Sequence, residues 1–565
     1  MRVPLLIAVC CAAVWAAPHP TVKKLDVRVP MRDGVHLSAN VFLPADQPRV
    51  PAILVRTPYG KGTDITEHYQ AFVDHGFAIV VEDVRGRHDS EGTFRPLEQE
   101  PADGDDTLNW IARQPWCDGK IGMMGGSYLG IVQWKVAVLN NPHLKAIFPV
   151  VSGDDDYRDR FYSTGGAMKL GNRLNWMSDN LRVSGYLPDF AKFVLHLPLK
   201  TADVAATGQT SEMYQKALRH PTFDAFWRGI STREQLSKVH IPVFAVGGWY
   251  DNFAESDLEA YAALSRNSGL DRILIGPWPH NMSYKFPGVD FGPASTVPVR
   301  ALQLEWFDQW LKGKDTRLVS TPPVKIFVMG ANRWREERQW PPEGVSFTPM
   351  FLESRGHANT LEGDGTLGQR PRRRSPDDRF TFDPQDPVPT RGGAVCCNPR
   401  VFPWGPMDQR AVEQRSDVLV YTSKPLKNDL EVIGPVKVML YASTSARDTD
   451  FTAKLVDVFP DGFARNLTDG ILRLRYRASL ERVEPAVPGE IYRISVDAGV
   501  TSNVFLKGHR VRLEISSSNF PRFDRNPNTG GPVATETKLV RAVQTIYHDQ
   551  DHPSQVLLPV MRPKP

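Results

Sequence analysis

The segment KIGMMGGSYLG, residues 120–130, carries the strongest structural signal in this chain of 565 residues. An apolar, strand-like run precedes its glycines, and an apolar helical run at residues 131–139 follows them. A serine at such a sharp strand-to-helix turn, with small residues on both sides, has its hydroxyl lifted above the edge of a parallel sheet. Ser127 is therefore our candidate nucleophile. The alternative is a glycine-rich turn whose serine caps the helix, so the motif needs partners elsewhere in the chain.

Two further strand-like runs lead to the partners that such a serine needs. In α/β-hydrolases the acid and then the histidine follow the serine along the chain, each after the C-terminal end of a strand. The apolar run at residues 241–246 leads to Asp251, and the run at residues 272–275 leads to His280. We therefore predict a triad in which His280 takes the proton of Ser127 and Asp251 orients the imidazole.

The tetrahedral intermediate of this reaction carries an oxyanion that needs preorganised hydrogen-bond donors. In the predicted fold one donor is the backbone N–H of the residue after the nucleophile, which is Tyr128 here. Removal of one such donor by mutation costs about 3 kcal/mol of transition-state stabilisation. Tyr128 is therefore the first predicted component of the oxyanion hole.

Four motifs together resemble a known family of hydrolases. They are RTPYG at residues 56–60, GGSYLG at 125–130, GGWYDNF at 247–253 and GPWPH at 276–280. This set resembles the cocaine esterase group of the CocE/NonD hydrolases, whose wider family includes X-Pro dipeptidyl-peptidases, α-amino-acid ester hydrolases and glutaryl acylases. The resemblance implies that the tyrosine of RTPYG, Tyr59, donates its phenol to the oxyanion. A tyrosine packed at the base of a loop is the alternative.

The similarity continues far beyond the predicted site. It runs through DVRGR at residues 83–87 and through residues 450–458, 516–521 and 526–530, so it covers nearly all of the chain after the N-terminal segment. For the last part of the chain, the resemblance implies a jelly roll.

The residues that flank the triad bear on the substrate. Relatives that recognise a free α-amino group present carboxylates to the ammonium, because a buried cation must be paired. This chain keeps acidic residues at 154–156 but has Asn252 and Phe253 after the triad aspartate, where the amino-ester hydrolases have carboxylates. The resemblance leaves Asp155 as a candidate ammonium ligand, whereas Phe253 makes the flank apolar, as in the cocaine esterase type. The alternative for the acidic cluster is a solvated turn or a helix N-terminus.

Two adjacent cysteines are candidates for a wall of the substrate pocket. In the cocaine esterase group a loop of the β domain closes the acyl pocket after a DPVP segment. Here DPVP at residues 386–389 leads to Cys396 and Cys397, so the resemblance implies that these cysteines line the pocket. A buried pair remote from the pocket is the alternative. With Cys117 these cysteines make an odd number, which leaves either a thiol unpaired or the adjacent pair joined to each other. The spacing matches no metal motif, and we expect neither a metal nor another cofactor.

The pattern of apolar residues changes along the chain and divides it into segments of different predicted structure. Strand-like and helix-like segments alternate in residues 17–151 and 239–338, which predicts an α/β-hydrolase domain with a parallel sheet. Residues 152–238 have helical periodicity and are expected to form a cap over the site. Residues 339–565 contain short alternating runs between turn residues, which predict an all-β sandwich.

The N-terminus is typical of a secretory signal peptide. A basic residue at position 2, an apolar stretch and the sequence VWA at residues 14–16 predict cleavage after about residue 16. The stretch is too short to span a membrane. We therefore expect an exported protein, periplasmic or extracellular, without a stable membrane anchor.

Composition excludes some functions and leaves three hypotheses. The net charge is only +4 and no basic stripe with interleaved aromatics is present, so we expect no nucleic-acid partner. The leading hypothesis is a serine esterase or acylase for a small ester with an apolar acyl group. The second is a dipeptidyl-peptidase or amino-ester hydrolase that acts on short peptide-like substrates. The third, a carbohydrate-binding protein with a vestigial site, conflicts with the intact candidate residues. The sequence leaves the oligomeric state open, a homo-oligomer included.

Overall fold

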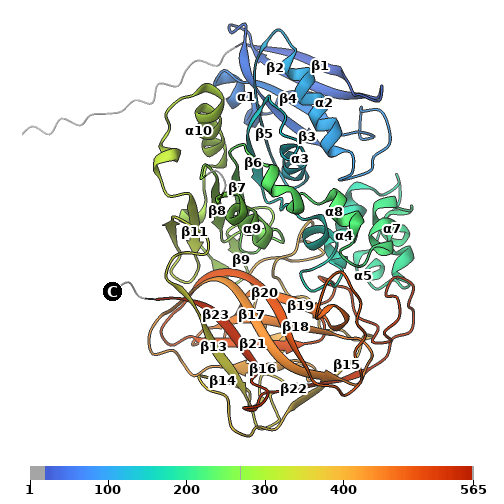
Figure 1. Cartoon of the computed structure of the whole chain (residues 1–565), viewed down its shortest axis with the longest axis vertical. Helices are drawn as coiled ribbons and strands as arrows, with labels where there is room; N and C mark the ends of the chain where they lie inside the picture. Colours follow the sequence, from blue (N-terminus) through green and yellow to red (C-terminus); the bar gives the residue numbers. More distant parts are fainter. Residues whose placement is uncertain (1–19, 267–268, 563–565) are drawn as a thin grey trace, which may run out of the picture.

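A computed structural model describes residues 20–266 and 269–562 of the chain. The predicted signal peptide, residues 1–16, lies outside these residues. The described part contains a mixed sheet with helices, a helical segment and an all-β domain (Figure 1). None of the helices in the described ranges is both long and apolar enough to cross a membrane.

The first domain is built on a ten-stranded sheet whose central strands are parallel. Its order is β1-β2-β4-β3-β5-β6-β7-β8-β11-β12, and the seven strands from β4 to β11 in this order are parallel to one another, whereas β2 and β12 pair antiparallel at the two ends of this set. The bounds are β1 Thr21–Pro30, β2 His36–Pro44, β3 Val50–Thr57, β4 Ala78–Asp83, β5 Cys117–Gly126, β6 Leu144–Val150, β7 Phe244–Gly248, β8 Arg272–Gly276, β11 Val324–Val328 and β12 Arg333–Glu337. A short hairpin, β9 Lys285–Phe286 and β10 Val289–Asp290, stands apart from the sheet.

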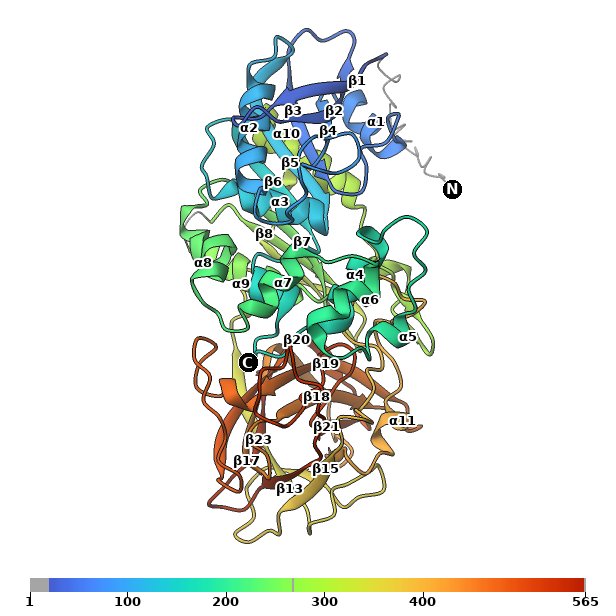
Figure 2. The ribbon, with the colours of Figure 1, turned by 90° about the vertical axis from the view of Figure 1, so that its right-hand side faces the viewer.

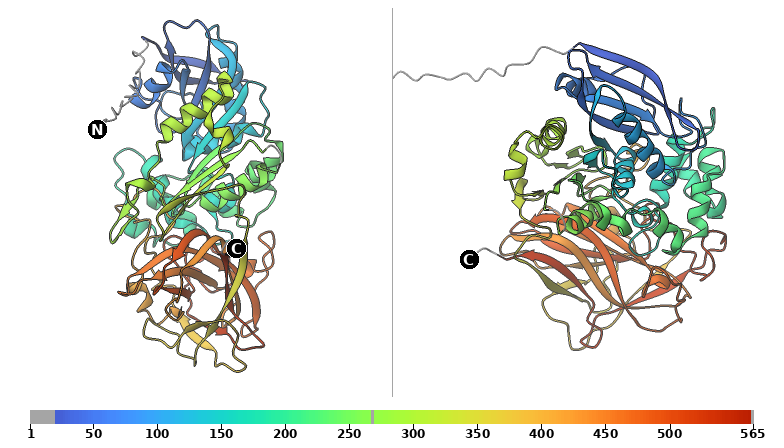
Figure 3. Two further views of the ribbon diagram at one scale, coloured as in Figure 1. Left: turned by 90° about the vertical axis from the view of Figure 1, so that its left-hand side faces the viewer. Right: turned by 45° about the horizontal axis from the view of Figure 1, so that its top comes forward.

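Helices cover both faces of this sheet, as the alternation of strands and helices predicted. Two of them, α1 Glu67–Asp74 and α10 Val299–Lys312, pack on one face. On the other lie α2 Glu100–Ala112, α3 Tyr128–Ala137 and α9 Ala254–Leu264. Figure 3 (left) shows α10 lying across the sheet. Because the central strands are buried on both sides, they read as continuous apolar runs in the sequence.

The segment predicted as a cap is helical and lies between the sheet and the β domain (Figure 2). It begins with a π-helix, η1 Asp156–Phe161, and continues with α4 Leu170–Asn180. Short helices complete it: α5 Phe190–Phe193, η2 Leu199–Thr201, α6 Ala202–Thr207, α7 Glu212–Arg219, α8 Ala225–Ile230 and η3 Arg233–Lys238.

The remaining strands form the all-β domain that the alternating runs predicted. Its sheet has the order β15-β22-β17-β23-β13-β14-β16-β21-β18-β19, with β20 paired to β17. The bounds are β13 Val345–Glu353, β14 Thr366–Gly368, β15 Asp378–Phe382, β16 Leu419–Thr422, β17 Leu430–Thr444, β18 Asp450–Val458, β19 Ala464–Arg473, β20 Tyr492–Phe505, β21 Arg510–Ser516, β22 Ala542–Tyr547 and β23 Gln555–Met561. The short helices η4 Pro293–Ser295, η5 Arg317–Ser320, α11 Arg410–Glu413 and η6 Leu474–Tyr476 lie in connections. That this domain is a jelly roll stays a prediction.

The two domains share a continuous apolar core. Buried residues of β8, β11 and α9 pack in the same cluster as those of β17, β18 and β20. After β11 the backbone of Met329 donates to the carbonyl of Ser502 (3.0 Å) and accepts from Val504 (2.8 Å). The domains are therefore joined by main-chain hydrogen bonds as well as by apolar packing.

Candidate active site

The turn between β5 and α3 holds Ser127 in a conformation that few residues adopt. Its backbone has φ 56° and ψ −124°, a left-handed region that costs free energy for a residue with a side chain. A Cβ at position 130 would lie 2.6 Å from the Cβ of Ser152, so only glycine fits where the turn meets the neighbouring strand. This is the geometry of a nucleophile elbow, which raises the serine hydroxyl above the sheet.

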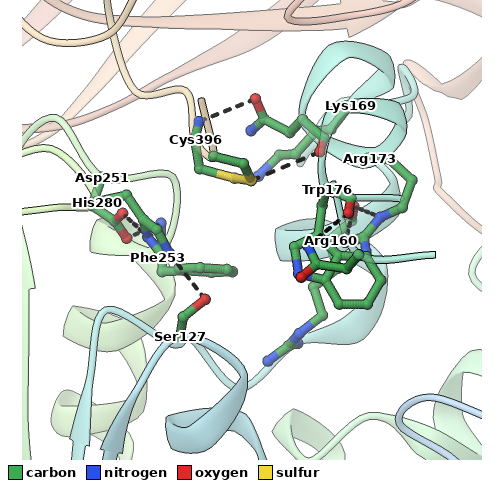
Figure 4. Close-up of a disulfide and its surroundings, with 12 residues drawn as sticks. Ser127, Arg160, Lys169, Arg173, Trp176, Asp251, Phe253, His280 and Cys396 are labelled. Carbon is green, nitrogen blue, oxygen red and sulfur yellow. Dashed lines mark hydrogen bonds and ion pairs between the residues drawn. A yellow bond between two sulfur atoms is a disulfide. The ribbon is translucent and has the colours of Figure 1, made fainter. Parts of the chain in front are cut away.

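The three predicted triad residues lie together at the C-terminal edge of the sheet (Figure 4). The Nε2 atom of His280 is 2.9 Å from the Oγ of Ser127, and its Nδ1 is 2.7 Å from the Oδ2 of Asp251. The second oxygen of Asp251 accepts the backbone N–H of Phe253 (3.0 Å). With Nδ1–H donating to the buried carboxylate, the lone pair of Nε2 faces the serine hydroxyl.

The three residues meet because β5, β7 and β8 belong to one parallel set. Only β6 separates β5 from β7, and β8 follows directly. Loops that leave the carboxyl ends of neighbouring parallel strands emerge at the same edge.

Tyr59 reaches this site from the loop after β3. Its hydroxyl accepts the indole N–H of Trp176 at 3.1 Å and is hydrogen-bonded to Ser127. The residue as a whole is 41% exposed, but burial of its hydroxyl end raises the pKa of the phenol, and the hydrogen bonds with Trp176 and Ser127 offset only part of this effect. The phenol therefore stays protonated and can donate a hydrogen bond beside the nucleophile.

Tyr128 occupies the first position of α3. The N–H groups of the first helical turn have no acceptor within the helix, so the N–H of Tyr128 points outward at the end of the helix where the nucleophile lies. Its side chain has a separate role, because the hydroxyl donates to the buried Glu100 (2.8 Å) and accepts the N–H of Leu97 (3.2 Å). The ring stacks on Trp176 at a centroid distance of 6.2 Å.

A cavity of about 570 Å³, its open mouth included, lies over the nucleophile. Most of its walls are apolar or aromatic. Among its lining residues are Leu97, Tyr128, Ile131, Phe161, Trp176, Met213 and Phe253. Phe253 is 6% exposed and its ring lies 5.8 Å from the imidazole of His280. The structure therefore places Phe253 in the pocket, as the sequence predicted.

Asp155 does not line this cavity, which corrects its prediction as an ammonium ligand. Its carboxylate caps η1, where it accepts the N–H groups of Tyr157 (2.9 Å) and Arg158 (3.0 Å). The same carboxylate also accepts the guanidinium of Arg158 at 2.6 Å. Burial by itself would raise the pKa of this carboxyl, but the charge and hydrogen bonds of Arg158 outweigh burial and lower it. This buried carboxylate already has a cationic partner and lies outside the cavity, so the helix N-terminus alternative describes it.

Asp159, which was not predicted from the sequence, lies at the cavity wall where Asp155 was expected. It lines the cavity over Ser127 and also a second, polar cavity behind it. Burial and the nearby charge of Asp155 raise its pKa to about 7, against the opposing influence of Arg160 and Lys169. Its position one helical turn after Asp155 was the available signal.

Two arginines of the cap border the same cavity. Arg160 donates to the carbonyls of Ser152 (3.0 Å) and Gly153 (3.1 Å), and Arg173 lies 4.4 Å above the ring of Phe161. Neither arginine, nor Trp176, was predicted from the sequence, because nothing in a helical segment shows which side chains face a site in another domain.

Cys396 and Cys397 line the cavity and are bonded to each other. The structure thus resolves the two open alternatives: the adjacent pair is joined, and Cys117 is a free, buried thiol. The predicted position in the pocket agrees with the structure, and the alternative of a remote pair is wrong.

Two family models match the chain. The model for X-Pro dipeptidyl-peptidase (S15 family) matches residues 33–282, and the model for the X-Pro dipeptidyl-peptidase C-terminal non-catalytic domain matches residues 317–557. The first range contains every triad residue, and the second covers most of the β domain.

Individual relatives match over nearly the whole length. Cocaine esterase of Rhodococcus sp. (strain MB1 Bresler) is 39% identical over 95% of this chain and 98% of its own. An aminopeptidase from the marine sediment archaeon Thaumarchaeota archaeon has a TM-score of 0.83 at 25% identity, covering 100% of this chain and 99% of its own. An α-amino acid ester hydrolase has a TM-score of 0.82 at 25% identity, covering 99% and 98%. The resemblance inferred from the motifs is confirmed.

Proposed function

Since this chain belongs to the cocaine esterase family, it is a serine hydrolase, and we propose that it cleaves carboxylic esters with an apolar acyl group. The observation that carries the proposal is the Ser127 hydroxyl, 2.9 Å from His280, on the floor of a largely apolar cavity. The apolar part of the walls favours an apolar acyl group, because its burial there removes apolar surface from water.

The proposed reaction proceeds through an acyl-enzyme. Ser127 Oγ attacks the ester carbonyl while His280 Nε2 takes its proton, and Asp251 stabilises the imidazolium. The tetrahedral oxyanion accepts hydrogen bonds from the Tyr128 N–H and the Tyr59 hydroxyl. The C–O bond to the alcohol then breaks, and His280 returns the proton to the leaving oxygen. Water repeats these steps on the Ser127 ester and releases the acid.

The first test identifies the nucleophile. A serine-directed phosphonate ester is expected to label Ser127 alone, and Ser127→Ala is expected to lower kcat for p-nitrophenyl butyrate by about 10⁴-fold or more while the fold is retained. Ser320→Ala is the matched control, because this hydroxyl only donates to the carbonyl of Arg317 (2.9 Å) on the surface. Labelling at another serine, or full activity of Ser127→Ala, would contradict the assignment.

A second candidate function is the hydrolysis of amino esters or peptides with a free N-terminus. Asp159 favours it, because a carboxyl at the cavity wall can pair with an ammonium, and two solved structures of similar fold are an aminopeptidase and an α-amino acid ester hydrolase. Arg160 and Arg173 oppose it, because a substrate cation would lie near two cations of the cap. At position 252, where a second carboxylate would help to bind a substrate ammonium, the chain has the uncharged Asn252.

The same assay separates the two candidates with a matched pair of variants. The ratio of kcat/KM for an amino-acid ester over its des-amino analogue is expected to stay below about ten in the wild type. Neither Asp159→Asn nor Asp155→Asn is expected to change it. A ratio well above ten that collapses in Asp159→Asn but not in Asp155→Asn would select the second candidate.

Export is part of the proposal and is supported by the N-terminal residues alone. Sequencing of the mature N-terminus in a secreting host is expected to place it near residue 17.

A further inference from the structure

The disulfide between Cys396 and Cys397 forms part of the cavity wall over the nucleophile. Both residues line that cavity together with Ser127, Phe253 and His280. In Figure 4 the sulfurs lie above Ser127 and the ring of Phe253, with Trp176 to their right. The bonded pair is thus an apolar surface that a substrate at Ser127 would meet.

This wall is held between two parts of the molecule. The loop that carries it belongs to the β domain, where Gly393 and Gly405 pair through two backbone hydrogen bonds of 2.7 and 3.0 Å. On the other side the N–H of Cys396 donates to the side-chain oxygen of Asn172 in α4 (3.2 Å). Cys396 is 7% exposed, so its position is fixed, whereas Cys397 is only partly buried.

The bond also imposes an unusual backbone at its second residue. Cys397 has φ 120°, in the region that favours glycine and that other residues avoid unless the surroundings impose it. A bond between neighbouring cysteines closes a small ring and supplies such a constraint. Without the bond, Cys397 is expected to relax toward an ordinary conformation.

When the S–S bond is reduced, the two sulfurs must move apart, and this movement takes up part of the pocket volume. Bonded sulfurs lie about 2.05 Å apart, whereas sulfurs that are not bonded repel each other below about 3.5 Å. At least one of them must therefore move by roughly 1.5 Å on reduction. Cys396 is buried, and its N–H is held by the side chain of Asn172. Cys397 is only partly buried, and its sulfur makes a single long contact, 3.9 Å to the carbonyl oxygen of Asn172, so we expect Cys397 to be the residue that moves.

We propose that the Cys396–Cys397 disulfide is a specificity-determining wall of the acyl pocket, and that its reduction to two thiols narrows the range of acyl groups accepted at Ser127. This inference rests on the proposed esterase function. In the bonded form a bulky aryl acyl group fits beside the sulfurs. In the reduced form the displaced side chain of Cys397 occupies part of that space, and small acyl groups are still accepted.

The reductant is a small dithiol, which reduces the protein disulfide by thiol–disulfide exchange and needs no further reagent. One of its thiolates attacks a sulfur of the pair, the S–S bond breaks and a mixed disulfide forms. The second thiol of the reagent displaces the protein sulfur and closes the oxidised reagent. Two electrons pass to the pair, which takes up two protons as thiols. An oxidising compartment outside the cytosol would keep the wall intact.

The test compares two esters with the same leaving group, p-nitrophenyl benzoate and p-nitrophenyl acetate. Treatment of the full chain with dithiothreitol is expected to lower the kcat/KM ratio of benzoate over acetate by about tenfold or more, the effect of a misfit of one methylene group in an apolar pocket. Reoxidation with oxidised glutathione is expected to restore it. The tryptic peptide GGAVCCNPR, residues 392–400, reports the redox state through the mass of two hydrogen atoms.

Three variants complete the design. Cys396→Ser with Cys397→Ser is expected to show the low ratio with or without dithiothreitol. Cys396→Ala with Cys397→Gly removes the bond but tolerates φ 120°, so it is expected to keep a high ratio even if the serine variant folds poorly. Cys117→Ala, which removes the remaining described thiol, is expected to respond like the wild type.

The outcomes separate this inference from the proposed function. An unchanged ratio in protein whose peptide is fully reduced would overturn the inference, as would a loss of the response in Cys117→Ala. Failure to find the bonded peptide after oxidation would also overturn it. Loss of activity on both esters in oxidised wild type, with no phosphonate label on Ser127, would instead overturn the esterase function.

Discussion

Tyr59 shows how a single side chain joins two parts of the site. Its hydroxyl lies between the nucleophile and the indole of Trp176, which comes from the cap. Because the indole N–H donates to the phenol oxygen, the phenol O–H stays available to donate a hydrogen bond to the oxyanion. A donor placed in this way is expected to bind the oxyanion more tightly than the substrate carbonyl.

Tyr59→Phe tests this role without a change of shape. We expect kcat to fall by about 10²- to 10³-fold with a smaller change in KM, because the lost hydrogen bond strengthens only in the transition state. Steady-state kinetics with p-nitrophenyl butyrate measure both constants. Tyr186→Phe is the matched control, since that hydroxyl donates to the carbonyl of Ala205 (2.8 Å) inside the cap. A rise in KM alone would make Tyr59 a binding residue.

Among the elements, the start of the cap depends on close contact with the β domain. The N–H of Arg473 in β19 donates to the carbonyl of Gly165 at 2.9 Å. A Cβ at position 165 would lie 1.9 Å from the carbonyl oxygen of Ile471 and 2.7 Å from the Cα of Leu472. Only glycine allows the two backbones to approach this closely.

Gly165→Ala is therefore expected to push the cap away from β19. Overpacking of this kind lowers the free energy of unfolding by about 1–3 kcal/mol. We therefore expect the melting temperature to fall by about 2–5 °C. Gly229→Ala is the matched control, because no atom lies within 4 Å of its added Cβ and the residue is exposed in α8. Alanine is expected to be neutral or slightly stabilising there. Equal melting temperatures for the two variants would contradict the close-contact argument.

At the scale of the whole molecule, a pair of carboxyl groups lies where the two domains meet. Glu255 of α9 and Asp497 of β20 are hydrogen-bonded to each other beside the polar cavity behind the active site. Burial, and then the charge of Asp497, raises the pKa of Glu255 well above its usual value. Burial also raises the pKa of Asp497. Two carboxyls this close cannot both ionise readily, so the folded protein holds one proton between them.

This shared proton makes stability depend on pH. The folded state keeps the proton at pH values where the unfolded chain has released it, so the contribution to stability is full at low pH and is lost as pH rises through the raised pKa. Asp497→Asn keeps a hydrogen-bond donor for Glu255 without the second charge. We expect it to raise the melting temperature by about 1–3 °C at alkaline pH and by less near pH 5.

Melting curves at several pH values measure this difference. Asp461→Asn is the control, because Asp461 lies in an exposed turn and accepts only the N–H of Phe463 (3.0 Å). Parallel curves of melting temperature against pH for wild type and Asp497→Asn would show that no proton is shared.

The order and type of the strands around the triad, and the family of the chain, follow from local sequence patterns. Each of Ser127, Asp251 and His280 follows an apolar run that is buried on both faces of the sheet, so its position was readable from local sequence. Parallel strands then bring their carboxyl ends to one edge whatever the remaining contacts are. The motifs around them showed the resemblance for the same reason.

Which residues of the cap and of the β domain face that edge depends on long-range packing instead. Asp155 and Asp159 are similar in sequence context, yet the first caps η1 and the second reaches the cavity, because the direction of the π-helix is set by packing. The contact of Trp176 with Tyr59 and the position of the Cys396–Cys397 wall join residues more than a hundred positions apart. Contacts at such separations depend on how cap and β domain pack on the hydrolase domain, and no local pattern encodes that packing.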